Sequence, residues 1–405
     1  MDLAATHSTL QFDGIPFFAR FALRLASRLR CGTLHVRLPD QRMVTLRGEV
    51  PGPAASIELK NYRFARGLVI GGDIGMAEAY IRGDWTTPDL AHLLYLFCLN
   101  EDLVDRAFAG NMLVRLCRRV LHRLRRNTRE GSRRNIHQHY DLGNEFFSAW
   151  LDPSMTYSSA LFSAETADLP AAQQHKYEQL AKAIELRPGQ SVLEIGCGWG
   201  GFAEFAAKTY GAKVLALTIS REQHEFALRR IHEAGLSEIV EVRLQDYRDQ
   251  TGQFDRIASI EMFEAVGEQF WPVYFQQLQQ RLKPGGLAGI QTITVHDKHF
   301  VDYRRRVDFI QQYIFPGGML PSAAILRSLA QRFHIPIKGE RVFGQDYAKT
   351  IAIWRAKFSE AWPDLTSLGF DEQFRRLWEY YLSYCEAGFR AGKIDVRQLV
   401  FAHRA

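Results

Sequence analysis

A glycine-rich stretch, SVLEIGCGWGG at 191–201, is the first feature of the sequence that could do chemistry. Gly196, Gly198 and Gly201 have the GxGxxG spacing, and Gly200 adds a fourth glycine. A hydrophobic run that ends in such a loop predicts a strand, then a turn that brings the backbone close to a ligand, then a helix. The spacing alone is weak evidence for any one nucleotide, so the flanking residues decide the ligand.

The residues around the loop favour S-adenosylmethionine over a dinucleotide. Glu194 directly precedes the glycines, where a carboxylate suits the cationic amino-acid end of S-adenosylmethionine. The second predicted strand ends at 218–220 in Thr-Ile-Ser, so it offers no acidic residue for the ribose of a dinucleotide. The third strand ends in Gln245 and Asp246, where the amino group of an adenine could be recognised. We therefore expect S-adenosylmethionine as the cofactor.

Strands and helices alternate from about residue 170 onward, which predicts the elements that position this loop. The strands are expected at 191–196, 213–220, 238–246, 254–263 and 287–295, and the helices at 171–186, 201–210, 221–235 and 271–282. Such alternation indicates an α/β fold with a doubly wound, mostly parallel sheet. Ligands bind at the carboxyl edge of such a sheet.

A smaller α+β domain is predicted over residues 1–130, ahead of a larger domain over 131–405. Its expected elements are helices at 15–31, 75–83 and 87–103 and strands at 33–38, 43–48 and 56–60. The first helix has Phe18, Phe21, Leu25 and Leu29 at helical spacing, with arginines distributed around them. This pattern fits a helix packed in the core, and it also fits a helix that lies on a membrane surface.

Composition limits the class of protein. The chain has 405 residues, enough for two or three domains, and a net charge of +6, which favours anionic partners. Five cysteines are scattered without a CxxC pair, which argues against a zinc site or a disulfide framework and suits a reducing cytoplasm. We expect no metal. The sequence shows no signal-peptide pattern and no apolar stretch of the ~20 residues that a spanning helix needs, so any membrane contact is expected to be peripheral.

An arginine run at 115–134 contains nine arginines opposed only by Glu130, with leucines interleaved. The pattern predicts a basic amphipathic helix that continues into a polar linker. One interpretation is a solvated face; the other is docking on an anionic membrane surface, which attracts basic residues by about 1 kcal/mol each. Nucleic acid is not an expected partner, because no aromatic-rich nucleic-acid motif accompanies the run.

Several stretches of the larger domain, in their order along the chain, resemble the cyclopropane-fatty-acyl-phospholipid synthase family. They include HYDLGNEFFSAWLDPSMTYSSALF at 139–162, the glycine loop, FDRIASIEMFEAVG at 254–267, FGQDYAKTIAIWRAKF at 343–358 and YCEAGFRAGKIDVRQLVF at 384–401. The resemblance covers about residues 130–403. It implies a class I methyltransferase (Rossmann-like) fold that moves the methyl group of S-adenosylmethionine onto a cis double bond of an unsaturated membrane phospholipid. A carbocation forms, and a bound bicarbonate takes the proton as the cyclopropane ring closes.

The resemblance also implies the site residues. The expected cofactor-binding residues are Tyr157, Ser158, Gly196, Gly198, Gly200, Thr218, Gln223, Gln245 and Asp246. The expected catalytic residues are Cys385, Glu264, Tyr347 and Gln291. The bicarbonate is expected to be held by Ser159, Glu264, Ile293 and Tyr347. Glu264 also fits a plain carboxylate at a helix start, and Cys385 also fits an unreactive buried thiol.

Three departures from the family pattern leave the product open. Ser159 stands where many members have Cys, and Ala265 stands where a His is common. Gln291 stands where many members have His, and an amide can hold an anion but cannot titrate. The product is therefore either a cyclopropane or a chain with a methyl or methylene branch.

Two other functions stay open at this point. One is a small-molecule amine methyltransferase, although a soluble amine would not require the first domain or the arginine run. The other is a lipid-binding protein without activity, although the glycine loop, Glu264 and Tyr347 are intact. We expect a cytoplasmic protein, peripherally associated with the inner membrane surface, and the sequence leaves a homodimer open.

Overall fold

The computed structural model describes residues 14–100, 142–166 and 168–403. The chain divides into two compact units, Met1–Val114 and Arg115–Ala405, here called the N-terminal and C-terminal units. The predicted boundary between 130 and 131 and the arginine run at 115–134 lie outside the described residues, so both stay predictions.

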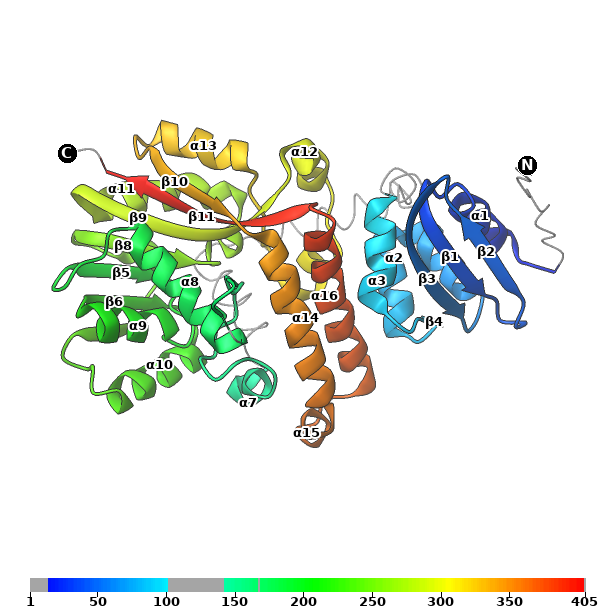
Figure 1. The fold of residues 1–405 in the computed structure, drawn as a ribbon, viewed down its shortest axis with the longest axis horizontal. Coiled ribbons are helices and arrows are strands. Elements are labelled where there is room, and N and C mark those ends of the chain that lie inside the picture. Colours follow the sequence, from blue (N-terminus) through cyan, green and yellow to red (C-terminus); the bar gives the residue numbers. More distant parts are fainter. Residues whose placement is uncertain (1–13, 101–141, 167, 404–405) are drawn as a thin grey trace. The chain divides into compact units, whose positions relative to one another are not determined.

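The N-terminal unit is built on a four-stranded sheet with the order β2-β1-β3-β4 (Figure 1). Its strands are β1 (Cys31–Arg37), β2 (Met43–Arg47), β3 (Val50–Leu59) and β4 (Trp85–Thr86), and its described helices are α1 (Phe17–Ala26), α2 (Arg63–Ile81) and α3 (Leu90–Leu99). β1 pairs antiparallel with β2 and parallel with β3. Alternate residues of β1 are buried, which gives the sheet one core face, as period-2 patterning predicts. This is the expected α+β arrangement.

Helix α1 turns a different face to the core than its spacing predicted. Ala19 and Leu23 are buried, whereas Phe17 and Phe21 are 69% and 45% exposed. The small side chain of Ala19 allows α1 to pack against α2. Phe21 therefore does not take the core position that a fully packed helix would give it, and an exposed phenylalanine pair lies on the surface next to Arg20.

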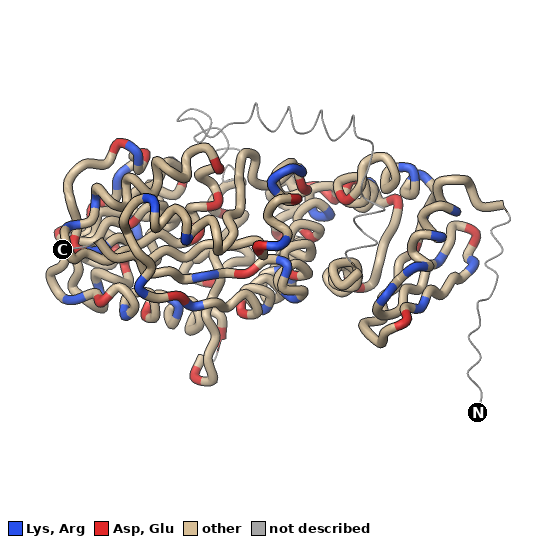
Figure 2. Tube along the Cα trace, turned by 90° about the horizontal axis from the view of Figure 1, so that it is seen from above, with Lys and Arg blue, Asp and Glu red and all other residues tan. Residues whose placement is uncertain are grey.

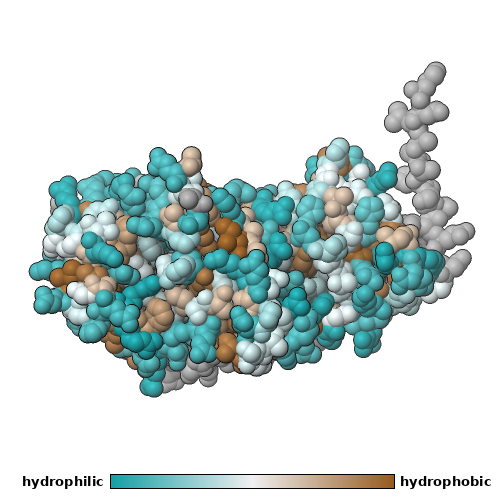
Figure 3. Space-filling model, turned by 60° about the horizontal axis from the view of Figure 1, so that its bottom comes forward, coloured by the Kyte–Doolittle hydropathy of each residue, from teal (hydrophilic) through white to brown (hydrophobic). Residues whose placement is uncertain are grey.

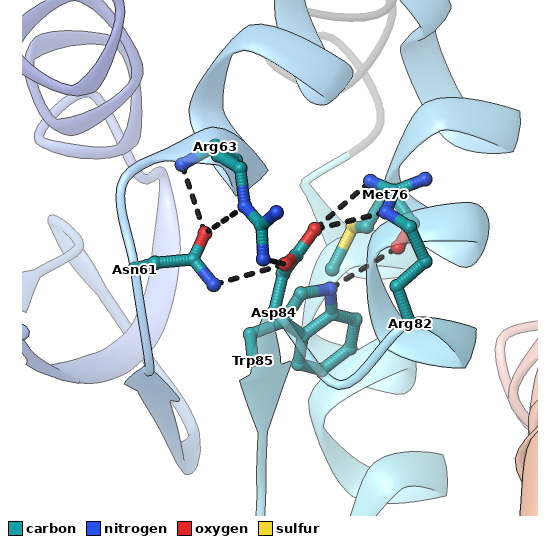
Figure 4. Close-up of polar contacts among 6 residues, drawn as sticks. All are labelled: Asn61, Arg63, Met76, Arg82, Asp84 and Trp85. Carbon is teal, nitrogen blue, oxygen red and sulfur yellow. Dashed lines mark hydrogen bonds and ion pairs between the residues drawn. The ribbon is translucent and has the colours of Figure 1, made fainter.

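A buried carboxylate joins the end of α2 to this sheet (Figure 4). Asp84 is 1% exposed and accepts four hydrogen bonds from side chains. The donors are Asn61 Nδ2 at 2.9 Å, Arg63 Nη2 at 3.1 Å, and Arg82 Nε and Nη2 at 3.1 and 2.9 Å. Burial opposes ionisation, but the donors outweigh it and hold the pKa of Asp84 below its ordinary value. The neighbouring Trp85 donates from Nε1 to the carbonyl of Met76 at 3.1 Å, which ties β4 to α2.

The C-terminal unit contains a seven-stranded sheet with the order β10-β11-β9-β8-β5-β6-β7. The strands are β5 (Ser191–Ile195), β6 (Lys213–Thr218), β7 (Val240–Leu244), β8 (Phe254–Ile260), β9 (Leu282–Val295), β10 (Ile337–Val342) and β11 (Ile394–Ala402). Five neighbouring strands, β9, β8, β5, β6 and β7, pair in parallel. Strand β11 is antiparallel to both β9 and β10. The predicted doubly wound, mostly parallel sheet is confirmed.

Helices cover both faces of this sheet (Figure 1). The described helices are α7 (Gly143–Ser148), α8 (Leu169–Ala183), α9 (Gly201–Tyr210), α10 (Arg221–Glu233), α11 (Trp271–Arg281), α12 (Asp297–Arg305), α13 (Ala323–Arg332), α14 (Gly344–Glu360), α15 (Trp362–Ser367) and α16 (Glu372–Arg390). Leu193 and Ile195 of β5 pack with α11 and α13, whereas Val192 packs with α8, α9 and α10. Successive strand residues point to opposite faces, so the two clusters lie on opposite sides of the sheet.

Helices α14 and α16 lie side by side and are joined through α15 (Figure 1). They carry Tyr347 and Cys385, two of the predicted catalytic residues. Within the described ranges, no helix is long and apolar enough to cross a membrane. Lys and Arg are interspersed with Asp and Glu along the described trace of both units (Figure 2).

Candidate active site

The candidate site lies at the carboxyl ends of three neighbouring strands. β8 pairs in parallel with β5 on one side and with β9 on the other. Glu194 lies near the end of β5, Glu261 directly follows β8, and Gln291 of β9 is in register with Ile260. This edge of an α/β sheet is where ligands bind.

The glycine loop follows β5 with three left-handed residues, as the spacing predicted. Gly196, Gly198 and Gly200 have φ values of 82°, 54° and 82°. A Cβ at Gly196 would lie 2.6 Å from Met262 Cγ, and one at Gly200 would lie 3.1 Å from Ala227 Cβ. A Cβ at Gly198 would meet no atom within 4 Å, so this residue faces open space. Gly196 and Gly200 therefore keep the loop packed, while Gly198 leaves room for a ligand.

Glu194 fits the cationic end of the expected cofactor. The residue is 3% exposed, and its Oε2 atom has no hydrogen-bond partner among the described residues. Burial raises the pKa of Glu194 to about 8, against a hydrogen bond from the backbone of Ala203 and the charge of Lys176. A cation placed next to Oε2 would stabilise the ionised carboxylate, which is the chemistry that the amino group of S-adenosylmethionine supplies.

The other predicted cofactor residues on β6 and β7 are bonded within the chain. Thr218 Oγ1 donates to Gln223 Oε1 at 2.9 Å, so these two residues form one pair at the end of β6. Asp246 is buried, and Arg248 donates to its two carboxylate oxygens from Nε at 2.9 Å and Nη2 at 2.5 Å. Gln245 donates to a neighbouring glutamine side chain at 3.0 Å. Adenine recognition by Gln245 and Asp246 stays a prediction, and Arg248 competes for the same carboxylate.

Tyr157 and Ser158 come from the loop after α7. The hydroxyl of Tyr157 lies 2.7 Å from that of Tyr381 on α16, and its ring centroid lies 5.4 Å from that of Trp354. Ser158 is buried, and its Oγ accepts a hydrogen bond from the Lys176 ammonium at 2.7 Å. An aromatic wall and a buried cation therefore meet at this loop.

Three of the predicted residues surround the carboxylate of Glu261, which the sequence analysis did not single out. The backbone N–H of Ser159 donates to Glu261 Oε1 at 2.8 Å, and Gln291 Nε2 donates to the same oxygen at 2.7 Å. Tyr347 donates from its hydroxyl to Glu261 Oε2 at 2.7 Å. Gln398 Nε2 donates to Gln291 Oε1 at 3.0 Å and fixes the amide that faces the carboxylate. We call Ser159, Gln291 and Tyr347 the donor cage.

Glu264 and Ile293 form a second pair beside this cage. The backbone N–H of Ile293 donates to Glu264 Oε1, while Glu264 Oε2 is buried without a hydrogen-bond partner among the described residues. The backbone of Glu264 is fixed as well, because its carbonyl accepts from Met319 N at 2.9 Å. Two acidic side chains thus lie three residues apart at the end of β8.

Burial sets the protonation of these groups. Burial, reinforced by the charge of Glu261, raises the pKa of Glu264 to about 8, so this carboxyl is mostly protonated at neutral pH. The pKa of Glu261 is also raised overall, because burial outweighs the hydrogen bonds from Tyr347 and Gln291 and the charge of Lys176, which lower it. Lys176 is itself fully buried, and burial lowers its pKa to about 7. Burial and the Glu261 charge raise the pKa of Tyr347, which therefore remains a hydrogen-bond donor.

Cys385 lies on α16 outside the donor cage. Burial and the charge of Asp308 raise the pKa of its thiol, so the sulfur is uncharged at neutral pH. A catalytic role for Cys385 stays a prediction, and it would have to be one for a neutral thiol. Among the described residues, no group of His, Cys, Asp and Glu could hold a metal ion.

The sequence carried signals for two of the residues that the analysis missed. Glu261 is the first residue after a buried strand, the position that Gln245 holds after β7. Lys176 lies on the buried stripe of α8 between Gln173 and Leu180, at the spacing of a helix face that packs in the core. Gln398, by contrast, lies in β11, for which no strand was predicted.

Comparison with known proteins places the C-terminal unit in a family. The family model for mycolic acid cyclopropane synthetase matches residues 127–399. The chain is 40% identical over 346 residues to "Tuberculostearic acid methyltransferase UfaA1" of Mycobacterium tuberculosis, covering 81% of this chain and 78% of the relative. It is 35% identical over 374 residues to "Cyclopropane-fatty-acyl-phospholipid synthase" of Escherichia coli, covering 89% and 90%.

Solved structures agree with this assignment. The mycolic acid cyclopropane synthase CmaA1, "complexed with SAH and CTAB", superposes with a TM-score of 0.63 at 30% identity over 67% of this chain and 98% of its own. The cyclopropane synthase MmaA2 of Mycobacterium tuberculosis has the same TM-score at 29% identity, with the same coverage. Coclaurine N-methyltransferase, at 18% identity and a TM-score of 0.56, shares the fold alone. The expected family, fold and enzyme class are thereby confirmed. The chain belongs to the mycolic acid cyclopropane synthetase family, and it is an S-adenosylmethionine-dependent methyltransferase of the lipid-modifying kind.

Proposed function

We propose that the protein transfers the methyl group of S-adenosylmethionine to a cis double bond in an unsaturated phospholipid acyl chain and closes a cyclopropane ring. The observation that carries this proposal is the adjacency of two sites on neighbouring strands. Glu194 lies near the end of β5, the open face of Gly198 follows that strand, and a caged carboxylate follows β8. A methyl acceptor that reacts between them would have a base within reach, as ring closure requires.

The residues of the chain have separate tasks in this proposal. When bound, S-adenosylmethionine supplies an electrophilic methyl group. An alkene is a weak nucleophile, so the loop around Gly198 and the Tyr157 wall must hold the two reactants in line. The aromatic faces of Tyr157 and Trp354 can stabilise a carbocation and keep water from it.

A branched product is the second candidate, and two observations favour it. The relative at 40% identity is named a methyltransferase, whereas the cyclopropane synthase relative is 35% identical. The donor cage also has Gln291 in place of a titrating group. The same transfer followed by a different proton loss would give a methylene branch. An amine substrate has weaker support, since the amine methyltransferase shares the fold alone.

The bicarbonate that the resemblance implies does not fit the donor cage. Ser159, Gln291 and Tyr347 all donate to Glu261, and Ile293 donates to Glu264. A second anion at these donors would meet the charge of Glu261 in a buried place. We therefore assign no step to bicarbonate, which stays a prediction.

The decisive experiment combines the chain with labelled S-adenosylmethionine and vesicles of unsaturated phospholipid. Label should enter the lipid, and proton NMR of the released fatty acid should show cyclopropane protons; vinylidene protons would show the methylene branch instead. Vesicles of fully saturated phospholipid are the control. Label in a soluble amine but not in lipid would refute the proposal.

We extend the proposal to peripheral docking on an anionic membrane surface, in the cytoplasm. The net charge of +6 and the exposed pair Phe17 and Phe21 support it. On the face drawn in Figure 3, the hydrophobic residues form small separate groups within a mainly hydrophilic surface. The double change Phe17→Ser and Phe21→Ser should lower co-sedimentation with anionic vesicles, whereas Met43→Ser, at a residue 55% exposed in the same unit, should not. Equal binding by both variants would remove α1 from the docking surface.

A further inference from the structure

The carboxylate of Glu261 has the shape and the contacts of a bound small anion. Its Oε1 accepts from Ser159 N at 2.8 Å and from Gln291 Nε2 at 2.7 Å, and its Oε2 accepts from Tyr347 at 2.7 Å. A carboxylate and a bicarbonate share the planar O–C–O group that such donors recognise. The side chain of Glu261 thus uses the donors through which a free anion would be held.

The surroundings of the cage disfavour any additional anion. Ile293 N, the fourth donor expected for a bicarbonate, is bonded to Glu264. Glu264 itself has a pKa raised to about 8 by burial and by the charge of Glu261, so the site already resists a second negative charge. A free bicarbonate would add that charge beside Glu261, whose carboxylate already occupies the donors of the cage.

The backbone at Glu261 is strained in a way that aims its side chain into the cage. Its φ is +50°, in the left-handed region that residues with a side chain rarely adopt. The conformation is held because Glu261 N donates to the carbonyl of Gln291 at 2.8 Å. Strain of this kind costs about 1–3 kcal/mol and is concentrated at functional sites.

Glu261 keeps exposed surface that two of its donors lack. Glu261 is half-buried, unlike Ser159 and Gln291, which have no exposed surface.

From these observations we infer that Glu261 is the catalytic base of this chain and replaces a free bicarbonate; the inference rests on the proposed function. The alkene electron pair forms a carbon–carbon bond to the methyl group while the sulfur–carbon bond breaks and leaves its electrons on sulfur. Glu261 then takes a proton from the added methyl group. The electrons of that carbon–hydrogen bond close the ring, or form a methylene double bond after a hydride shift. Glu261 returns the proton to water and is regenerated.

One arm of the test measures turnover on unsaturated phospholipid vesicles in carbonate-free buffer, with and without sodium bicarbonate. Wild type should turn over equally in both. Glu261→Gln should lower turnover by about 10²–10⁴-fold, the usual contribution of a general base, with unchanged affinity for S-adenosylhomocysteine by calorimetry. Glu268→Gln, which changes a nearby carboxyl paired with Arg304, should behave as wild type.

The other arm needs no lipid and measures, through the melting temperature, whether an anion binds to the donor cage. Glu261→Ala leaves the donor cage open to a carboxylate-sized anion. Sodium bicarbonate should raise the melting temperature of Glu261→Ala above that seen in sodium chloride of equal ionic strength, and it should restore part of its turnover. The melting temperature of wild type and of Glu261→Gln should not respond.

Two outcomes overturn the inference: wild-type turnover that rises with bicarbonate, or Glu261→Gln that turns over like wild type. Failure of the proposed function looks different, because wild type would then methylate no vesicle lipid. The melting arm would still decide about the cage in that case. A bicarbonate response of wild type would count against Glu261, and a response of Glu261→Ala alone would support it.

Discussion

At the scale of single residues, three carboxyls lie at the carboxyl edge of one sheet. Glu194 has an unpartnered buried oxygen, Glu264 is mostly protonated at neutral pH, and Glu261 is held by three donors. In the proposed reaction, these different surroundings would give chemically identical groups different tasks. Glu194 would attract a cation, Glu264 would stay protonated, and Glu261 would take a proton.

The pH profile should report on the cage around Glu261. The Tyr347 hydroxyl and the Lys176 ammonium lower the pKa of Glu261, whereas burial raises it. Tyr347→Phe and Lys176→Met should therefore each move the acid limb of kcat/KM to higher pH, because a base must be ionised to work. Tyr313→Phe, at a residue 38% exposed, is the matched control. An unmoved acid limb in both variants would mean that another group titrates.

Gly198 should be needed for cofactor binding and not only for the turn. Gly198 and Gly211 have φ values of 54° and 60°, and a Cβ at either meets no atom within 4 Å. Gly198→Ala and Gly211→Ala should thus lose similar stability, about 1–2 kcal/mol for a left-handed residue. Calorimetry should show at least a tenfold loss of S-adenosylmethionine affinity for Gly198→Ala alone. Equal affinities would place the cofactor away from this loop.

At the scale of elements, the sequence predicted the strands and helices of the parallel core because each has a strong period. β5, β6 and β8 appear where their apolar runs lie, although β8 ends at Ile260 and leaves Glu261 outside the strand. The region after residue 296 was left without elements, and it supplies α14, α16 and β11. The donor cage joins segments more than a hundred residues apart, Ser159 with Gln291 and Tyr347. No local sequence pattern predicts a contact between segments so far apart. The family resemblance therefore indicated the three residues of the donor cage, and only the structure showed that they surround Glu261.

The junction between α2 and β4 should depend on Asp84. Asp84→Asn removes the charge to which Arg63 and Arg82 are bonded. Because both arginines are largely exposed, the free energy of unfolding should fall by about 1–3 kcal/mol, less than for a fully buried ion pair. Hydrogen exchange should quicken across residues 61–86. Asp40→Asn, at an exposed ion pair with Arg42, should change little. Unchanged exchange for Asp84→Asn would mean that packing around Trp85 alone holds the junction.

At the scale of the whole chain, buried carboxyls and a buried ammonium group affect the free energy of unfolding in different pH ranges. The carboxyls of Glu194 and Glu264 have pKa values raised to about 8, and the ammonium of Lys176 has one lowered to about 7. From about pH 5 to about pH 7, the two carboxyls are protonated in the folded chain and ionised in the unfolded one. Folding then takes up protons, so the free energy of unfolding falls as pH rises. Above about pH 7 the neutral Lys176 opposes this trend, because the unfolded chain keeps that proton.

Glu264→Gln should flatten this fall. The amide keeps an oxygen for the N–H of Ile293 but cannot ionise, so the proton uptake of Glu264 disappears. One such group contributes at most about 1.4 kcal/mol per pH unit to the slope. Urea unfolding at a series of pH values between about 5 and 7 should show the variant gaining stability relative to wild type as pH rises. Glu268→Gln, at a carboxyl paired with Arg304, should run parallel to wild type. Parallel curves for Glu264→Gln as well would mean that Glu264 is ionised in the folded chain, and that the pair it forms with Glu261 carries two charges.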